Sequence, residues 1–385
     1  MPNGPIPGVV AFQKPDQSAI LSQAAQLMVL GMQLRGEVAP DRLPADDLTR
    51  LGSLSLPVAP GRIDTRRVRA AIATRYSLSE KAMLAGAVGE PITSNVIPDL
   101  AVRHFGKPTP LTAAELMEGA LQNPNELVRV SAATAYFDRS SEPARLIKVL
   151  EDGTRSTDNL TRHVAATALS RVAPESSALD ALLAQRPGQA TFGAASHTTA
   201  IIHGTWAANG SWWQPGGDFF TYLTKMLPNL QRTPPLPPAP PWDAPYGAPD
   251  EFRWSGGYSD AARALAANEL AQWVSNHNAQ GLDLITHSHG GSVAMLATQP
   301  GMAITAKEMV LLSCPVHFPK YEPAFSKVQK IVSVRVHLDL VILADRGGQR
   351  FSDPRIQENV LPIWFDHFAT HDPQNWTMYN IPAIL

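Results

Sequence analysis

The sequence predicts a protein in two parts: an all-helical domain followed by an α/β domain, whose mostly parallel sheet is flanked by helices. Two observations predict this division. Before about residue 190, apolar residues recur at helical spacing and no strand-like alternation occurs. After it, apolar runs of strand length alternate with helical segments, which is typical of α/β folds. We therefore expect three regions: a Pro/Gly-rich segment (1–59), a helical domain (60–188) and an α/β domain (189–385).

Composition excludes several classes of protein. The 385 residues carry a net charge of −2 and no Lys/Arg run, so we expect no nucleic-acid partner. The sequence contains no stretch of 18 or more apolar residues, so we expect no transmembrane segment. The N-terminus lacks basic residues followed by an apolar run, so cytoplasmic residence is the default expectation, and export without a cleavable signal stays open. The single cysteine, Cys314, cannot form an internal disulfide and is expected to be a buried packing residue.

The N-terminal half contains a repeat. One helix is expected near Gln17–Leu34. Further on, the pattern R-x-x-A-A-T-A occurs at 129–135 and again 33 residues later at 162–168, with a looser copy at 67–73. Small alanines let neighbouring helices pack closely, and periods of this size are typical of helical-hairpin solenoids. The region from about 60 to 185 resembles HEAT-type repeats, and an ordinary alanine-rich bundle is the alternative.

The C-terminal half reads as a series of strands and helices. The clearest helix is Ser259–Asn276, with Ser259 as its N-cap. The run of prolines within 227–249 excludes helix and inner strand, and predicts either a lid over a site or a surface spacer. We expect strands at Thr198–His203, Phe252–Ser255, Leu282–His287, Met309–Ser313, Val332–Leu338 and Val360–Trp364.

The most informative stretch follows the strand that ends at His287. Ser288 lies in the turn Thr286-His-Ser-His-Gly290, directly before a helix, which has the form of a nucleophile elbow. Small residues are favoured in such a turn, and Gly290 and Gly291 meet this demand, although Thr286 replaces the first glycine of G-x-S-x-G. The pattern predicts that Ser288 attacks an acyl carbon.

Partners for the serine follow in chain order. Asp339 directly follows a predicted strand and is favoured as the acid, with Asp345 as the alternative because its surroundings read as a turn. His371 lies in a loop-like context and is favoured as the general base, with His367 as the alternative.

An oxyanion hole is expected from two backbone N–H groups, those of Thr205 and His289. Thr205 follows the strand that ends in His203 and Gly204, and the glycine lets the chain turn there. The substrate pocket is expected to include His203, Gly204, Trp206 and Trp212, since aromatic side chains near the oxyanion loop favour apolar acyl groups.

Together these motifs resemble the α/β-hydrolase superfamily, in particular its lipases and esterases, over about residues 190–385. The resemblance is carried by His-Gly-Thr at 203–205, His-Ser-His-Gly-Gly at 287–291, Asp339 and His371, which occur in the family's order. It implies a serine hydrolase that cleaves carboxylic esters through a Ser288–His371–Asp339 triad and an acyl-enzyme. Two departures are Thr286 and the missing first strands, so that the sheet begins at the family's third strand.

The expected substrate is an ester or a lipid, and a lipase is not distinguished from a small-ester esterase or an amidase. No cofactor is expected: the triad needs none, and no metal-binding spacing such as H-E-x-x-H occurs. The alternative function is a catalytically inactive scaffold that binds a protein partner through its helical repeats.

Overall fold

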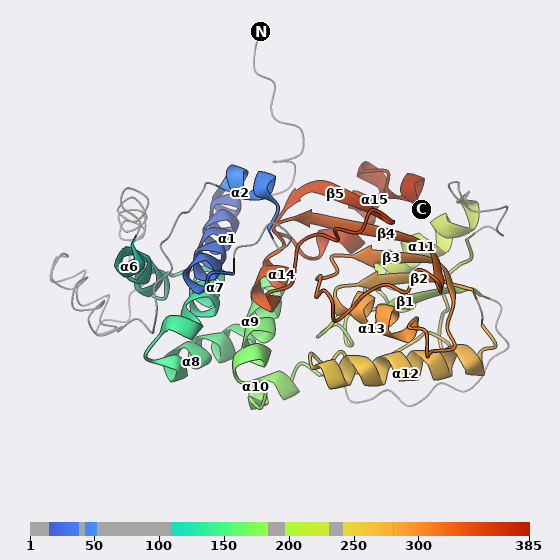
Figure 1. The fold of residues 1–385 in the computed structure, drawn as a ribbon, viewed down its shortest axis with the longest axis horizontal. Helices are drawn as coiled ribbons and strands as arrows, with labels where there is room; N and C mark the ends of the chain where they lie inside the picture. The colour runs from blue at the N-terminus through green and yellow to red at the C-terminus, as the bar shows by residue number, and fades with distance from the viewer. Residues whose placement is uncertain (1–14, 38–42, 52–108, 184–196, 231–241, 280) are drawn as a thin grey trace, which may run out of the picture. The chain divides into compact units, whose positions relative to one another are not determined.

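The computed structural model of the chain describes residues 15–37, 43–51, 109–183, 197–230, 242–279 and 281–385. They form two compact units (Figure 1). The first comprises residues up to 179 together with 343–346, and the second comprises 180–342 and 347–385. The boundary predicted at 188, the repeat copy at 67–73 and the proline run at 231–241 lie outside the described residues.

The described part of the first unit is helical. Its long first helix covers the segment where a helix was predicted near Gln17–Leu34. In chain order the helices are α1 (Pro15–Arg35), α2 (Ala45–Leu51), α6 (Pro110–Ala120), α7 (Glu126–Tyr136), the 3-10 turn η1 (Phe137–Arg139), α8 (Pro143–Gly153), α9 (Asn159–Val172) and α10 (Ser177–Asp180).

The two good repeat copies form α7 and α9, and they share one local geometry. Each helix begins with a side chain that accepts a hydrogen bond from the N–H three residues on, and in each the repeat arginine donates to a carbonyl six residues back. The cap pairs are Asn125–Val128 and Asp158–Thr161, and the arginine pairs are Arg129–Asn123 and Arg162–Ser156. The two copies thus share local hydrogen bonds as well as sequence, while the HEAT-type resemblance stays a prediction.

Small residues let these helices approach closely, as predicted. A Cβ atom at Gly31 of α1 would lie 2.6 Å from the Cα atom of Ala135 in α7. One at Gly153 of α8 would lie 2.8 Å from the Cβ atom of Ala165 in α9. A larger side chain at either glycine would force the helices apart.

The second unit is built on one parallel sheet of five strands, whose spatial order equals their order in the chain (Figure 1). Parallel neighbours need crossover connections, and helices supply most of them. The strands are β1 (Thr199–Ile202), β2 (Leu282–His287), β3 (Ala306–Leu312), β4 (Val328–His337) and β5 (Ile356–Trp364). The predicted α/β class with a parallel sheet is confirmed.

Both faces of this sheet are covered, which explains why its inner strands are buried along most of their length. Alternate residues enter two separate cores: Leu284 and Leu311 pack in one, Ile285 and Val310 in the other. Figure 1 shows α12 and α13 on one side of the sheet and α11 and α15 on the other, in agreement with the core members that these helices supply. The helices are α11 (Asp218–Met226), α12 (Asp260–Asn276), α13 (His289–Ala297), α14 (Leu340–Asp345) and α15 (Pro373–Met378), with 3-10 turns at Leu227–Asn229, Ala369–His371 and Ile381–Ile384.

Several local predictions can be compared with the structure. Helix α12 begins after Ser259, whose hydroxyl accepts from the Ala262 N–H as an N-cap, and Cys314 is buried, both as predicted. The strand predicted at Phe252–Ser255 is wrong: these residues are irregular, and the indole of Trp254 donates to the His203 carbonyl instead of a strand pairing there. Within the described residues, the segment before Phe252 makes an isolated parallel bridge beside β1, from Thr199 to Pro245.

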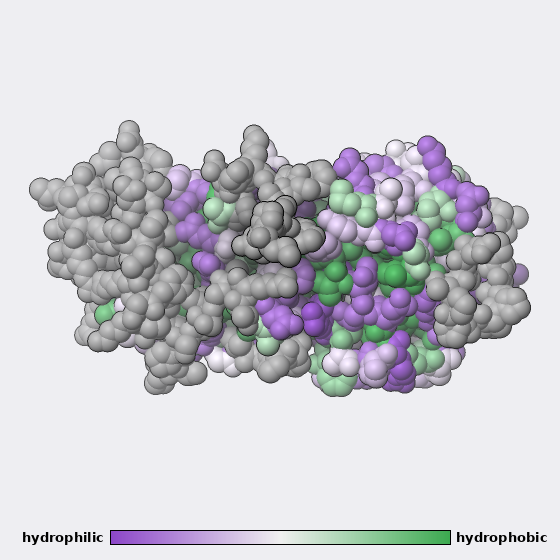
Figure 2. Space-filling view, turned by 90° about the horizontal axis from the view of Figure 1, so that it is seen from above, coloured by the Kyte–Doolittle hydropathy of each residue, from purple (hydrophilic) through white to green (hydrophobic). Residues whose placement is uncertain are grey.

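The surface of the second unit mixes polar residues with hydrophobic patches (Figure 2). Its described residues include the exposed apolar side chains Leu265, Phe318 and Met378. Among the helices that the structure describes, none has the length and apolar character needed to cross a membrane.

Candidate active site

The carboxyl ends of the parallel strands bring the predicted site residues to one edge of the sheet. His203 follows β1, Ser288 follows β2, Asp339 follows β4, and the loop with His367 and His371 follows β5. In open parallel sheets, ligands bind outside the carboxyl ends of the strands. The candidate site is therefore the edge at which these four segments end.

Ser288 has the strained backbone of an elbow. Its φ of 53° and ψ of −133° lie in a region that non-glycine residues rarely adopt. The turn is held on both sides: the Ser288 N–H donates to the Leu312 carbonyl, and the Ser288 carbonyl accepts from the Gly291 N–H. Strain of this kind costs of order 1–3 kcal/mol and persists only where the surrounding structure enforces it.

The glycines around Ser288 are required by close packing. A Cβ atom at Gly290 would lie 2.3 Å from the Ile202 carbonyl oxygen, and one at Gly204 would lie 2.7 Å from the Cβ atom of Ser288. Thr286 fits in place of the first glycine because its hydroxyl turns into the sheet and donates to the Val310 carbonyl, at 3.0 Å. The departure from G-x-S-x-G therefore leaves the turn intact.

Asp339 is bonded to an imidazole at this edge. Its Oδ2 accepts from His367 Nδ1 at 2.7 Å, and both side chains are buried. Its Oδ1 accepts the N–H groups of Val341 and Ile342 at the start of α14. Gln349 holds the backbone of Asp339 from both sides, since its side chain accepts from the N–H and donates to the carbonyl. No sequence motif pointed to Gln349.

The structure corrects the choice between the two histidines: Asp339 pairs with His367, not with His371. The reason is a tight turn after β5. Phe365 adopts a φ of 72°, its N–H donates to His337 and its carbonyl accepts from Leu340, so the chain is held beside the end of β4. His367, two residues on, is thereby placed against Asp339.

His371, at the end of a 3-10 turn, belongs to an aromatic cluster. Its ring stacks on Trp212 at 4.1 Å, and Phe219 lies 6.1 Å away. His287 connects the cluster to the Asp339 pair, because its ring centroid lies 4.7 Å from those of both His367 and His371. Its Nε2 also lies 3.2 Å from the His367 carbonyl oxygen. No sequence motif predicted this connecting position of His287.

The expected oxyanion loop meets the elbow. Thr205 Oγ1 lies 3.0 Å from His289 Nδ1, so the two residues whose N–H groups were predicted as donors are linked by their side chains. His289 is the first residue of α13, where backbone N–H groups have no acceptor within the helix. Trp206 is unsuited as a donor, since its N–H is bonded to the Gly256 carbonyl.

The expected pocket residues have different surroundings. His203 is fully buried with its ring centroid 4.5 Å from that of Trp213 and 5.5 Å from that of Trp254. Burial lowers the pKa of His203 to about 4, so the imidazole is neutral at pH 7 and packs as an aromatic side chain. Trp212 lies against His371 and His287, close to the Asp339 pair.

Two further carboxylates lie near this edge in the sequence. Asp345 ends α14 and is grouped with residues 343–346 in the first unit. Asp366 precedes His367, and burial raises the pKa of its carboxyl, with the nearby Asp339 adding to the effect. Of these three carboxylates, Asp339 is the one bonded to His367.

A scan against protein-family models finds no match to the chain, and a search of curated proteins finds none either.

Proposed function

We propose that the protein is a serine hydrolase of α/β-hydrolase type that cleaves carboxylic esters. Ser288 is the nucleophile, His367 the general base and Asp339 the residue that orients the base. The observation that carries the proposal is the buried Asp339–His367 hydrogen bond at the sheet edge where Ser288 occupies its strained turn. The chain order Ser, Asp, His is that of the α/β-hydrolase triad.

The chemistry follows from these positions. As Ser288 Oγ bonds to the ester carbonyl carbon, its proton passes to His367 Nε2, because Nδ1 is already engaged with Asp339. The imidazolium then protonates the leaving alkoxide as the C–O bond breaks, which leaves an acyl-serine. Water then attacks the acyl carbon and gives a proton to His367. The bond between the acyl carbon and Ser288 Oγ breaks, His367 returns the proton to Oγ, and the carboxylic acid is released.

Negative charge on the carbonyl oxygen needs two fixed donors. The N–H groups of His289 and Thr205 are our candidates, since α13 begins at His289 and the Thr205 side chain is bonded to that of His289. Loss of one such donor typically costs about 10²–10³ in kcat.

The aromatic cluster supports an apolar acyl group. Trp212, Phe219 and His371 lie together beside His287, which contacts the His367 loop. We propose an ester with a fatty or aromatic acyl part, in either a lipid or a small molecule, in preference to a charged acyl group.

The test is covalent labelling with a fluorophosphonate probe. The wild type is expected to be labelled and Ser288→Ala to be unlabelled. Ser292→Ala is the matched control, because this buried serine lies four residues further along the same turn and helix. A folded wild type without labelling would refute the proposal and favour the inactive scaffold, in which the helical repeats bind a protein partner.

The choice of base has its own comparison. His367→Gln should lower kcat for a chromogenic ester by about 10³-fold or more, whereas His371→Gln should keep most of the activity. Activity that survives in His367→Gln and collapses in His371→Gln would return the role to His371.

A further inference from the structure

The segment after Asp339 connects the two units. Helix α14 (Leu340–Asp345) begins at the candidate acid, yet residues 343–346 are grouped with the N-terminal helical unit.

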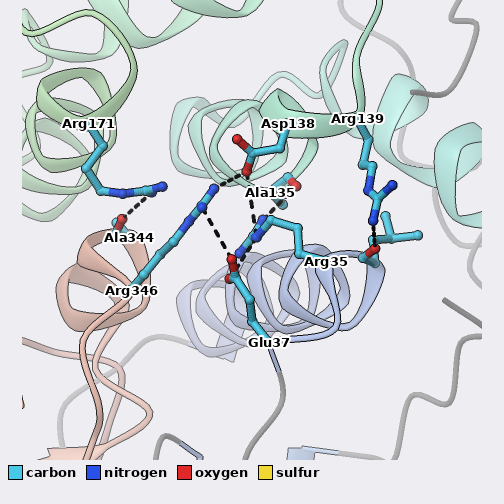
Figure 3. A network of polar contacts seen from close by, with 9 residues as sticks. Arg35, Glu37, Ala135, Asp138, Arg139, Arg171, Ala344 and Arg346 are labelled. Carbon is cyan, nitrogen blue, oxygen red and sulfur yellow. Dashed lines mark hydrogen bonds and ion pairs between the residues drawn. The ribbon is translucent and has the colours of Figure 1, made fainter. Parts of the chain in front are cut away.

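The C-terminal end of α14 is fixed by an ionic network within the helical unit (Figure 3). Arg346 forms an ion pair with Asp138 of η1 and lies 3.4 Å from a Glu37 carboxylate oxygen just after α1. Arg35 bonds the same Glu37 at 2.8 Å, so two arginines alternate with two carboxylates. Burial, with the neighbouring Arg346 charge, lowers the pKa of Arg35.

A second contact fixes the helix end independently. Arg171 of α9 donates to the Ala344 carbonyl at 3.0 Å (Figure 3). Carbonyls in the last turn of a helix lack N–H donors within it, and a cation there also offsets the negative end of the helix dipole.

The backbone at Arg346 shows that its side chain is needed there. Arg346 has a φ of 60°, its N–H donates to Leu343, and the Gly347 N–H donates to Ile342, which is a Schellman ending. Glycine is the usual residue at this left-handed position, because other side chains are strained in it. The ion pairs of Arg346 explain why an arginine occupies this strained position.

The other end of α14 holds the acid. Asp339 Oδ1 accepts from Val341 and Ile342 in the first turn, and Oδ2 accepts from His367. The direction of α14 therefore sets where Oδ2 stands relative to the imidazole.

We infer that Arg346 is a positioning residue for Asp339: by fixing the C-terminal end of α14, it sets the carboxylate that orients His367. The inference rests on the proposed triad for its effect on catalysis, while the link between Arg346 and Asp339 is a property of the folded chain.

The test uses Arg346→Gly in the full-length chain, because glycine keeps the left-handed helix ending and removes only the ion pairs. We expect kcat for a chromogenic ester to fall about tenfold with KM unchanged within about twofold, since small misplacements at a site cost up to ~10²-fold. Arg346→Lys should recover part of the loss. Arg350→Ala, at an exposed arginine four residues on, is the control and should behave as wild type.

A second readout does not depend on turnover. The proton between His367 Nδ1 and Asp339 should give a low-field NMR resonance, absent in His367→Gln, that shifts or broadens in Arg346→Gly. A wild-type resonance in folded Arg346→Gly, or wild-type kcat, overturns the inference. If the resonance moves but wild type is not labelled by the fluorophosphonate probe, the proposed function fails and the link between Arg346 and Asp339 stands.

Discussion

The backbone of Ser288 is strained, and the free-energy cost of this strain can be measured. With φ at 53° and ψ at −133°, Ser288 is in a conformation that costs a non-glycine residue of order 1–3 kcal/mol. Glycine tolerates this region but loses more conformational entropy on folding, by roughly 0.5–1 kcal/mol relative to alanine. We therefore expect Ser288→Gly to be more stable than Ser288→Ala by about 1 kcal/mol, while both variants are inactive.

The measurement is urea unfolding followed by tryptophan fluorescence. All eight tryptophans lie between Trp206 and Trp376, so the signal reports on the α/β unit alone. The matched control is the same pair of substitutions at Ser292, inside α13, where glycine should be less stable than alanine by about 1 kcal/mol.

The sign of the difference between glycine and alanine is therefore expected to reverse between positions 288 and 292. If glycine is the less stable variant at both positions, Ser288 is not strained, and the elbow interpretation is refuted. Midpoint shifts count only where the slope of the urea dependence is unchanged.

Three further predictions concern residues around Ser288. The pKa of His203 is lowered from 6.5 to about 4, so the unfolded chain takes up the proton first as pH drops. The free energy of unfolding should therefore fall by ~3 kcal/mol between these two pH values. Urea titrations at several pH values should show a smaller fall in His203→Phe. Gly204→Ala should lower kcat at least about 10²-fold, because the added Cβ atom would lie 2.7 Å from the Cβ atom of Ser288. The control in the ester assay is Gly301→Ala, where an added Cβ atom would have no atom within 4 Å. Equal activity of the two variants would contradict the packing argument. Asp366→Asn should raise the Tm at neutral pH, since the raised pKa of this partly buried carboxyl means that its ionised form destabilises the fold. The gain in Tm should grow as pH rises through that pKa, and a gain independent of pH in calorimetry would count against this explanation.

Much of the α/β unit follows from local pattern. Leu282–His287 is a short, mostly apolar strand before a small-residue turn, so strand, turn and helix are all favoured locally, and the structure has them there. Ser259 is likewise a local signal, because an N-cap hydroxyl acts within its own turn.

The pairing of Asp339 depends on contacts that are distant in sequence. His367 and His371 are both histidines in a C-terminal loop, and only the left-handed turn at Phe365 decides which of them meets the acid. The strand predicted at Phe252–Ser255 is wrong for a similar reason. Its aromatic residues suit a strand, but the Trp254 indole donates a hydrogen bond to the His203 carbonyl, which is distant in sequence. The ion pairs of Arg346 with Asp138 and Glu37 likewise join residues that are distant in sequence, and Arg346 is an ordinary charged residue in the sequence.

The sequential order of the strands has a consequence for how the chain reaches its folded state. β3 and β4 pair residues that are close in sequence, such as Val310 and Val332, whereas β1 pairs Thr199 with Asp283. Closing a loop of roughly 84 residues costs about 1 kcal/mol more than closing one of roughly 22, since the entropy cost grows with the logarithm of length.

We therefore expect β2 to β5 to assemble first and β1 to dock last. Ser288 and Asp339 would then stand at their shared edge before Gly204 and Thr205 arrive. In refolding, recovery of esterase activity should lag behind recovery of the sheet, because the last strand to dock carries the loop that receives the oxyanion.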